Sequence, residues 1–203
     1  MNLSTIIKFL FCCLISLSGN AQNAVEKANL SAICSKTIQI DSLEFFKNKQ
    51  NFTKIDSISD FKKVKGVIKI STKDSLFTFR DNNSDEKFIE YKVVGQENKN
   101  KWVLLLEQDY NQDYYYLINQ KNNKIVKLVG YPMFFGNKIL CQEGSYTDST
   151  GFIEIWNSNK GNLSLVSKFS FNACKICNIS DLYLKGNILY IRYNSNKYLK
   201  LKL

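Results

Sequence analysis

From Gly66 to the C-terminus the chain is a succession of short apolar segments separated by turns rich in Asn, Lys, Asp and Gly. In KIVKLV (124–129), GFIEIW (151–156) and KYLKLKL (197–203) apolar residues alternate with polar ones, the pattern of strands with one buried face. WVLLL (102–106) is apolar throughout, which predicts a central strand covered on both faces. Because no segment of this region shows a helical stripe, we expect an all-β domain of antiparallel strands.

The same pattern predicts where the strands lie. Each segment is bounded by residues that favour turns, so its ends can be read from the sequence. The predicted strands cover residues 67–71, 76–80, 87–94, 101–108, 114–119, 124–129, 137–143, 151–157, 163–171, 181–184, 187–193 and 197–203.

Parts of this strand-rich region resemble one another. LFTFRDNNSDEKFIEYKVVG (76–95) and YYYLINQKNNKIVKLVG (114–130) each contain a strand, a polar turn, a second strand and a glycine, and GFIEIWNSNKGNLSLVSKF (151–169) repeats the hairpin. A second element recurs as FGNKILCQE (135–143) and KGNILYIRY (185–193). Repeats spaced by roughly 35–50 residues are typical of β-propeller blades.

On YYYLINQKNNKIVKLVG, PMFFGNKILCQE and GFIEIWNSNKGNLSLV, residues 87–203 resemble a group of small exported Gram-negative bacterial proteins with WD40-like, propeller-type blades. The resemblance implies an incomplete or about four-bladed array over 66–203 and carries no known activity. The Trp-Asp dipeptide and the Gly-His pair of WD40 repeats are absent, since Asn157 follows Trp156 and the chain has no histidine. A rolled antiparallel β-barrel is the alternative architecture.

The first residues read as an export signal. Lys8 precedes an uncharged run over 9–17, and the small residues Gly19 and Ala21 occupy the −3 and −1 positions of a signal-peptidase site. The run is too short to span a bilayer, so we expect cleavage after residue 21, no stable membrane insertion, and a periplasmic or extracellular mature protein over 22–203.

Residues 22–65 carry weaker signals. Asp41 and Glu44 have the spacing of an N-cap and the third helical residue, which predicts a short helix over 42–49. We expect this partly helical segment to pack on the strand array as part of one domain and to cover an exposed edge strand.

The formal net charge of +10 comes almost entirely from lysines, because Arg80 and Arg192 are the only arginines. Lysines spread along the chain give a diffuse positive field without the bidentate contacts that arginine makes to bases and phosphates. We therefore expect no nucleic-acid partner and interpret the lysines as a solvated surface, with attraction toward an anionic envelope, a polysaccharide or an acidic partner as the alternative.

The absence of histidine removes the commonest general base and the commonest neutral metal ligand. We expect no catalytic residues, no metal site and no cofactor. A carboxylate-based enzyme acting on glycans through Glu107, Asp109 or Asp113 remains an alternative.

The mature chain has four cysteines, Cys34, Cys141, Cys174 and Cys177. An even number in an exported chain predicts disulfides, and we favour Cys174 with Cys177 and Cys34 with Cys141. Redox chemistry at the Cys174–Cys177 motif is less favoured because the motif lies between two predicted strands and not at a helix N-terminus. A zinc site is less favoured because no second close pair of cysteines is present.

Aromatic residues provide a further candidate site. Tyr114 and Tyr116 share one face of their predicted strand, and with Trp102 or Trp156 they would form a stacking platform for a sugar or a peptide. Ordinary packing between strands explains the same residues. Together these features predict an exported, non-catalytic binding protein for a protein or glycan, with an envelope immunity or inhibitor protein as a further alternative.

Overall fold

The computed structural model describes residues 35–55, 61–84, 86–97, 101–143, 151–170, 176 and 178–203. Within them the strands form four antiparallel sheets, here called sheets I to IV, and no sheet closes into the rolled barrel that was the alternative prediction. The predicted signal peptide at 1–21 and the cysteines Cys34, Cys174 and Cys177 lie outside the described residues.

Sheets I and II come first along the chain. Sheet I has the order β2–β3–β4, and sheet II has the order β5–β6–β7–β8–β9. Their strands are β2 (Lys63–Val64), β3 (Val67–Ser71), β4 (Leu76–Arg80), β5 (Asn82–Ser84), β6 (Lys87–Glu97), β7 (Trp102–Asp109), β8 (Asp113–Asn119) and β9 (Ile125–Leu128).

Sheets III and IV follow. Sheet III has the order β10–β11–β12–β13, and in sheet IV the early strand β1 joins three C-terminal strands in the order β1–β16–β15–β14. Their strands are β1 (Thr37–Ile40), β10 (Pro132–Phe135), β11 (Lys138–Gln142), β12 (Phe152–Asn159), β13 (Asn162–Ser170), β14 (Ile179–Lys185), β15 (Ile188–Tyr193) and β16 (Lys197–Lys202).

The strands expected from the alternation of apolar residues are all present, with ends displaced by a few residues at most. The short strands β1, β2, β5 and β10 were not predicted. The sequence was also wrong about the hairpin at 76–95, because β4 belongs to sheet I and β6 to sheet II. The polar residues between them form their own hairpin, in which Ser84 pairs with Lys87, and this leaves β4 free to pair with β3.

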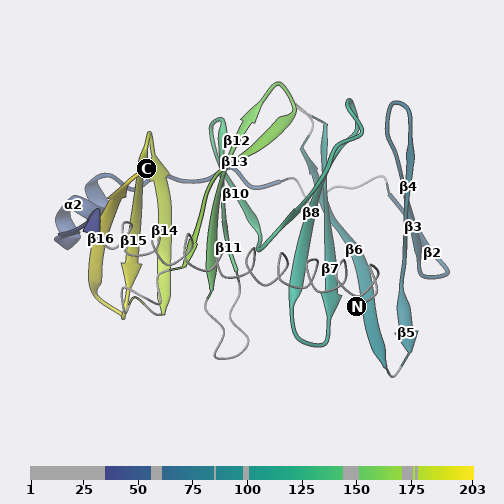
Figure 1. The fold of residues 1–203 in the computed structure, drawn as a ribbon, viewed down its shortest axis with the longest axis horizontal. Coiled ribbons are helices and arrows are strands. Elements are labelled where there is room, and N and C mark those ends of the chain that lie inside the picture. The colour runs from purple at the N-terminus through teal and green to yellow at the C-terminus, as the bar shows by residue number, and fades with distance from the viewer. Residues whose placement is uncertain are drawn as a thin grey trace, which may run out of the picture.

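The four sheets stand in a row along the longest axis of the molecule, with sheet I at one end and sheet IV at the other (Figure 1). Successive residues of a central strand serve opposite interfaces because side chains alternate along a strand. In β7, Val103 and Leu105 pack toward sheet I, whereas Trp102 and Leu104 pack toward sheet III. The prediction that WVLLL is covered on both faces is therefore confirmed.

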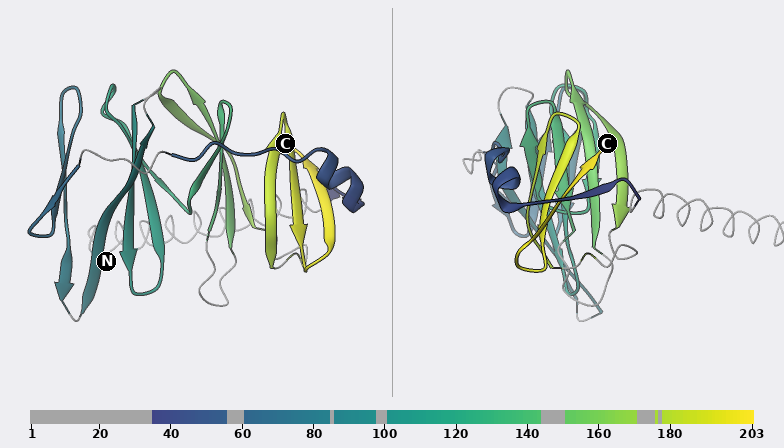
Figure 2. Two further views of the ribbon diagram at one scale, coloured as in Figure 1. Left: turned by 180° about the vertical axis from the view of Figure 1, so that it is seen from behind. Right: turned by 90° about the vertical axis from the view of Figure 1, so that its left-hand side faces the viewer.

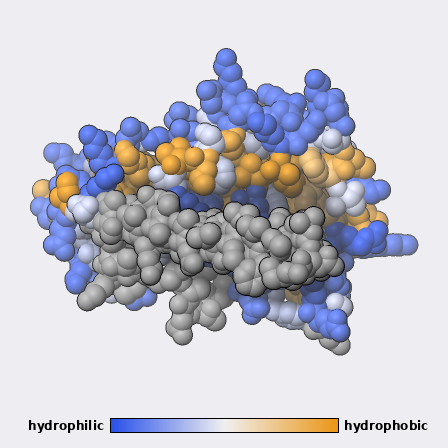
Figure 3. Space-filling model, in the orientation of Figure 1, coloured by the Kyte–Doolittle hydropathy of each residue, from blue (hydrophilic) through white to orange (hydrophobic). Residues whose placement is uncertain are grey.

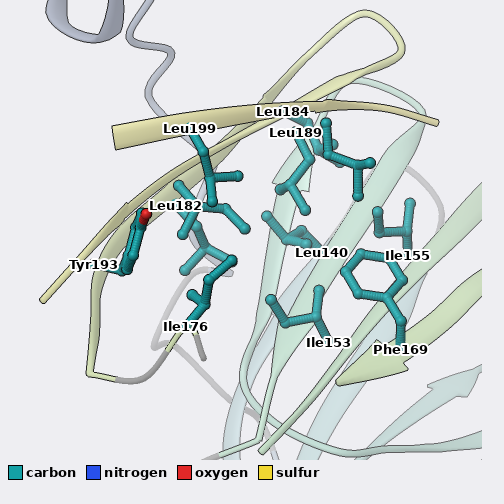
Figure 4. Packing of buried hydrophobic residues seen from close by; sticks show 12 residues of the cluster. Leu140, Ile153, Ile155, Phe169, Ile176, Leu182, Leu184, Leu189, Tyr193 and Leu199 are labelled. Carbon is teal, nitrogen blue, oxygen red and sulfur yellow. The ribbon is translucent and has the colours of Figure 1, made fainter. Parts of the chain in front are cut away.

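The same alternation continues into sheet III. Ile139 and Cys141 of β11 face sheet II, and Leu140 between them faces sheet IV. Figure 4 shows Leu140, Ile153 and Phe169 directed toward the leucines of sheet IV. Each such fully buried aliphatic side chain stabilises the fold by about 1.5–3 kcal/mol relative to an exposed one. Buried apolar residues at each interface thus hold neighbouring sheets face to face.

A short helix covers the outer face of sheet IV. Helix α2 (Ser42–Lys47) begins after Asp41, whose carboxylate accepts a hydrogen bond from the backbone N–H of Glu44 at 2.7 Å, as the sequence predicted. Phe45 is fully buried against Tyr183 and Tyr198, with ring centroids 5.0 and 5.1 Å away. The outer face of sheet IV is therefore closed by α2, while β1 covers the edge of β16.

After α2, the chain returns toward the opposite end of the row. Figure 2 shows this dark blue segment running along one side of the sheets. Lys49 pairs with Asp181 of sheet IV at 2.6 Å, and the Thr53 N–H donates to the carbonyl of Phe134 in sheet III at 2.9 Å. Ile55 then packs into the interface of sheets II and III. Residues 49–55 therefore tie three sheets together.

Hydrogen bonds between turns also link each sheet to the next. Asn123 in sheet II bonds Asp74 in sheet I, with its Nδ2 donating to Oδ2 at 3.2 Å. The Nδ2 of Asn122 donates to the Gly161 carbonyl of sheet III at 2.8 Å. Lys138 of sheet III donates to the Oδ1 of Asn187 beside sheet IV at 2.6 Å. These polar residues, abundant in the predicted turns, fix the spacing of the row.

Candidate functional site

The four aromatic residues predicted as a stacking platform do not share a surface. Tyr114 and Tyr116 lie on the face of sheet II that points toward sheet I, whereas Trp102 lies on the opposite face. Trp102 is fully buried, and its indole Nε1 finds no hydrogen-bond partner among the residues that the structure describes. Trp156 packs at the interface of sheets II and III and donates from Nε1 to Glu154 at 3.2 Å. The structure therefore brings together only the two tyrosines.

Tyr114 and Tyr116 belong to a cluster organised around Glu107 of β7. One carboxylate oxygen of Glu107, Oε2, accepts hydrogen bonds from the hydroxyls of Tyr91 at 2.7 Å and Tyr116 at 2.9 Å. Lys127 pairs with the other oxygen at 3.3 Å, and its ammonium lies 3.4 Å from the centre of the Tyr114 ring. Glu107 is only 9% exposed, so these contacts replace the water that its charge would otherwise require.

The cluster holds its two phenols in the neutral form. Burial raises the pKa of the Tyr91 and Tyr116 hydroxyls well above the ordinary range, and the hydrogen bond to Glu107 and its negative charge raise both pKa values further. A neutral hydroxyl that donates to a carboxylate is a stable structural contact. The arrangement explains the aromatic group as packing between strands with a satisfied polar centre.

The other carboxylates considered for catalysis also have partners within the chain. Asp109 accepts from the backbone N–H groups of Asn111 and Gln112, both at 2.7 Å, and so caps the turn between β7 and β8. Asp113 accepts from the side-chain amide of Gln108 at 3.4 Å. These contacts give Asp109 and Asp113 roles in the hairpin.

Cys141 is the one disulfide candidate within the described residues. It carries a free thiol that is completely buried between sheets II and III, and burial raises its pKa well above the ordinary value. Its candidate partners Cys34, Cys174 and Cys177 lie outside the described residues, so the predicted pairings stay predictions.

The outer face of sheet I differs from the interfaces between the sheets because its apolar residues are exposed and not buried. Its inner face carries Ile68, Ile70, Phe77 and Phe79, which pack against sheet II. The alternate residues point outward, and no described element of the chain packs over them: the side chains of Val64 and Leu76 are 62% and 55% exposed. Val64 lies on the edge strand β2 beside Val67, and Leu76 begins the other edge strand, β4, opposite Ser71. Exposed aliphatic residues on an uncovered sheet face mark a candidate binding surface.

Positive charge surrounds Val64 and its cross-strand neighbour Val67. A shallow hollow of about 470 Å³ lies on the outer face, and we call the residues that line it the basic face; they are Lys62, Val64, Lys65, Val67, Lys69 and Arg80. Within the described ranges, no carboxylate lines the hollow and no ion pair involves its four cations. The basic face therefore combines an apolar centre with cations that have no ion-pair partner in the described part of the chain.

Lys63 shows why some lysines of this segment belong to the basic face and others do not. Lys63 follows Lys62 in the chain but points to the inner side, where it pairs with Asp81 at 2.6 Å and Glu90 at 3.2 Å. Burial alone would lower the pKa of Lys63, but the hydrogen bonds and negative charges of Asp81 and Glu90 raise it overall. Alternation along β2 thus separates a paired lysine from an unpaired one.

Sequence reasoning missed the basic face because it treated the lysines as a diffuse surface. The sequence signal for the basic face lies in KKVKGVIK (62–69), in which the residues that point outward are lysines and valines. Strand pairing brings Arg80 beside Val67, and the turn at Lys65 and Gly66 joins β2 to β3. On the face of the molecule seen in Figure 3, apolar residues form an interrupted band with hydrophilic residues beside it.

Within the described part of the chain, no three His, Cys, Asp or Glu side chains gather in a way that could hold a metal ion. No helix in the same ranges is long and apolar enough to cross a membrane. Comparisons with protein-family models, curated protein sequences and solved structures find no significant match.

Proposed function

We propose that this chain is an exported, non-catalytic binding protein built on an open array of propeller-type blades, and that it binds a partner through the basic face. The observation that carries the proposal is the difference between the two ends of the row. Helix α2 covers the outer face of sheet IV, whereas the outer face of sheet I exposes Val64 in a hollow lined by four cations, none of which forms an ion pair within the described part of the chain.

The arrangement of the sheets supports the blade interpretation. Antiparallel sheets stacked face to face are the packing of propeller blades, and β1 completes the last sheet by pairing with β16, which joins distant parts of the chain in one blade. The recurring FGNK and KGN segments both form hairpin turns with a glycine at positive φ, Gly136 at 64° and Gly186 at 59°. Because α2 occupies the outer face of sheet IV, a ring closed by contact of sheets IV and I is blocked.

The polar contacts support a non-catalytic role. Glu107 is committed to two tyrosines and Lys127, and Asp109 and Asp113 stabilise the β7–β8 hairpin. A glycosidase needs two carboxylates facing one cleft with room for the sugar. These carboxylates are engaged in contacts within sheet II, which favours the binding hypothesis over the glycan-active enzyme.

The test is site-specific photo-crosslinking in the exported-protein fraction of the producing cells. A crosslinking side chain replaces Thr78, which is exposed on the outer face between Leu76 and Arg80, and a matched variant carries it at Ser164, exposed on sheet III. We expect a specific adduct from Thr78 that is absent from Ser164. The same adducts from both positions, or none from either, would contradict the proposal, as would release of sugars from envelope glycans by the purified protein.

A further inference from the structure

We infer that the basic face binds an acidic amphipathic helix of a partner protein, in the way that α2 covers the outer face of sheet IV. The inference rests on the proposed function and specifies the chemistry of the ligand. The chain has two terminal sheet faces that can be compared. The outer face of sheet IV is covered by α2, and the outer face of sheet I is open.

The covered face shows what such a sheet accepts. Phe45 of α2 inserts among the rings of Tyr183 and Tyr198, and Glu44 of the same helix pairs with Lys200 of β16 at 2.7 Å. The hydroxyl of Tyr183 donates to the Phe45 carbonyl at 2.5 Å. The cover therefore consists of an apolar side chain directed into the sheet and a carboxylate placed over a cation of the sheet.

The outer face of sheet I offers the two kinds of group that such a helix would contact, an apolar surface and cations. Val64 and Val67, which pair across β2 and β3, offer an aliphatic surface, and the four cations of the basic face line the hollow around them. Arg80 pairs across the strands with Val67, so a guanidinium that can bind a carboxylate in a bidentate manner lies beside the apolar centre. A helix with an apolar stripe flanked by Glu or Asp satisfies both features, as in other helix-in-groove complexes.

Dimensions agree with one helix. The five residues of β3 extend over about 17 Å. About three turns of α-helix cover the same length. The hollow is open and shallow, which suits a helix lying across the sheet better than a small molecule enclosed in a pocket.

A glycan fits this face less well. Sugar rings stack on aromatic side chains, and the aromatic residues of sheet I, Phe77 and Phe79, point inward toward sheet II. Valine and leucine offer no hydrogen bonds to hydroxyl groups. A second copy of this chain is also unfavourable, because two proteins of formal charge +10 repel each other at low salt.

The probe for the test is a short stapled helical peptide with Phe and Leu along one stripe and Glu on both flanks. Its controls are a stapled peptide of the same composition in scrambled order, and a polyuronate as a purely anionic polymer. Binding of each to the intact mature protein is measured by fluorescence anisotropy or competition with the labelled peptide, at low and at physiological salt.

Two charge variants of equal net charge locate the site. The first combines Lys65→Glu, Lys69→Glu and Arg80→Glu; the second combines Lys160→Glu, Lys197→Glu and Lys202→Glu at exposed positions on sheets III and IV. We expect the first to weaken binding of the patterned peptide by at least about tenfold and the second by about twofold at most. A third variant, Val64→Ser with Val67→Ser, tests the apolar centre and should weaken binding at both salt concentrations.

Equal weakening by the two charge variants would overturn the inference, as would equal affinity for the scrambled peptide or the polyuronate. Self-association that disappears in the first charge variant would identify a second copy as the occupant and would also overturn it. These failures differ from failure of the proposed function: a non-acidic partner crosslinked from Thr78 removes this inference alone, whereas absence of any specific adduct removes the proposed function.

Discussion

A Cβ atom at Gly130 would lie 1.8 Å from the backbone carbonyl oxygen of Gln142. Gly130 lies between β9 of sheet II and β10 of sheet III, and Gln142 ends β11. Gly130 therefore marks a place where the chain passes against another backbone as it moves from one sheet to the next.

Gly130→Ala should destabilise the protein by about 3 kcal/mol or more, because a backbone atom cannot move aside as a side chain can. Urea unfolding measures the change in the free energy of unfolding. Gly186→Ala is the matched control: its Cβ would meet nothing within 4 Å, so only the strain of a φ of +59° remains, about 1 kcal/mol. Equal losses in the two variants would contradict the close approach at Gly130.

Phe45 and Phe46 are neighbours in α2 with opposite exposure. Phe45 is fully buried on sheet IV, and Phe46 is 49% exposed. We expect Phe45→Ala to lower the free energy of unfolding by about 3–5 kcal/mol and Phe46→Ala by about 1 kcal/mol or less. Thermal or urea unfolding of the two variants tests whether α2 is a true cover of sheet IV, and a reversed order would show that it is not.

The Glu107 cluster predicts a loss of stability at high pH. The pKa of the Tyr116 hydroxyl is 10.0 in a model compound and is raised in the folded protein by burial and by Glu107. Its contribution to stability is therefore complete below pH 10 and is lost as the pH rises through 10 toward the folded value, by up to about 1.4 kcal/mol per pH unit.

Tyr116→Phe should consequently show a shallower fall in unfolding free energy between about pH 8 and pH 11 than the unchanged protein. Tyr91 and Tyr183, whose hydroxyl pKa values are also raised by burial, contribute to the fall in both proteins, so the difference between the two curves is the quantity of interest. Tyr110→Phe, at a side chain that is 65% exposed, is the control. Parallel curves for the unchanged protein and Tyr116→Phe would count against a buried hydroxyl–carboxylate contact.

The thiol of Cys141 should resist alkylation in the native protein and react after unfolding. Burial raises its pKa, which reduces the fraction of reactive thiolate, and the surrounding side chains exclude the reagent. Peptide mapping after labelling with and without denaturant measures both states. Detection of a Cys34–Cys141 disulfide in the same experiment would support the sequence prediction against the free thiol of the structure.

Much of the fold could be predicted because period-two alternation is a local property. The strand at 102–106, the helix after Asp41 and the recurrence of FGNK and KGN are written in neighbouring residues, and all three are present. Strand β10 was not predicted because it is short and begins with Pro132, which is tolerated at the first residue of an edge strand. The hairpin at 76–95 was wrong because the sequence does not show which sheet a strand joins.

The candidate site was harder to predict for the same reason. Glu107, Tyr91 and Lys127 lie on three different strands, and only their register brings them together. The aromatic residues were assigned to one surface, but Trp102 and Tyr116 point to opposite faces of sheet II. The basic face depends on β3 being the middle strand of a terminal sheet, which no local pattern shows.

Binding at the basic face requires one end of the row to be open while the other is covered, and labelling of introduced cysteines tests this most directly. In the isolated protein, Thr78→Cys on sheet I should react as fast as Ser164→Cys on exposed β13, and Tyr190→Cys beneath α2 should react far more slowly, as peptide mapping of each variant in its folded state will show. Protection of Thr78→Cys to the level of Tyr190→Cys would mean that the basic face is already covered, and the proposed mode of binding would be wrong.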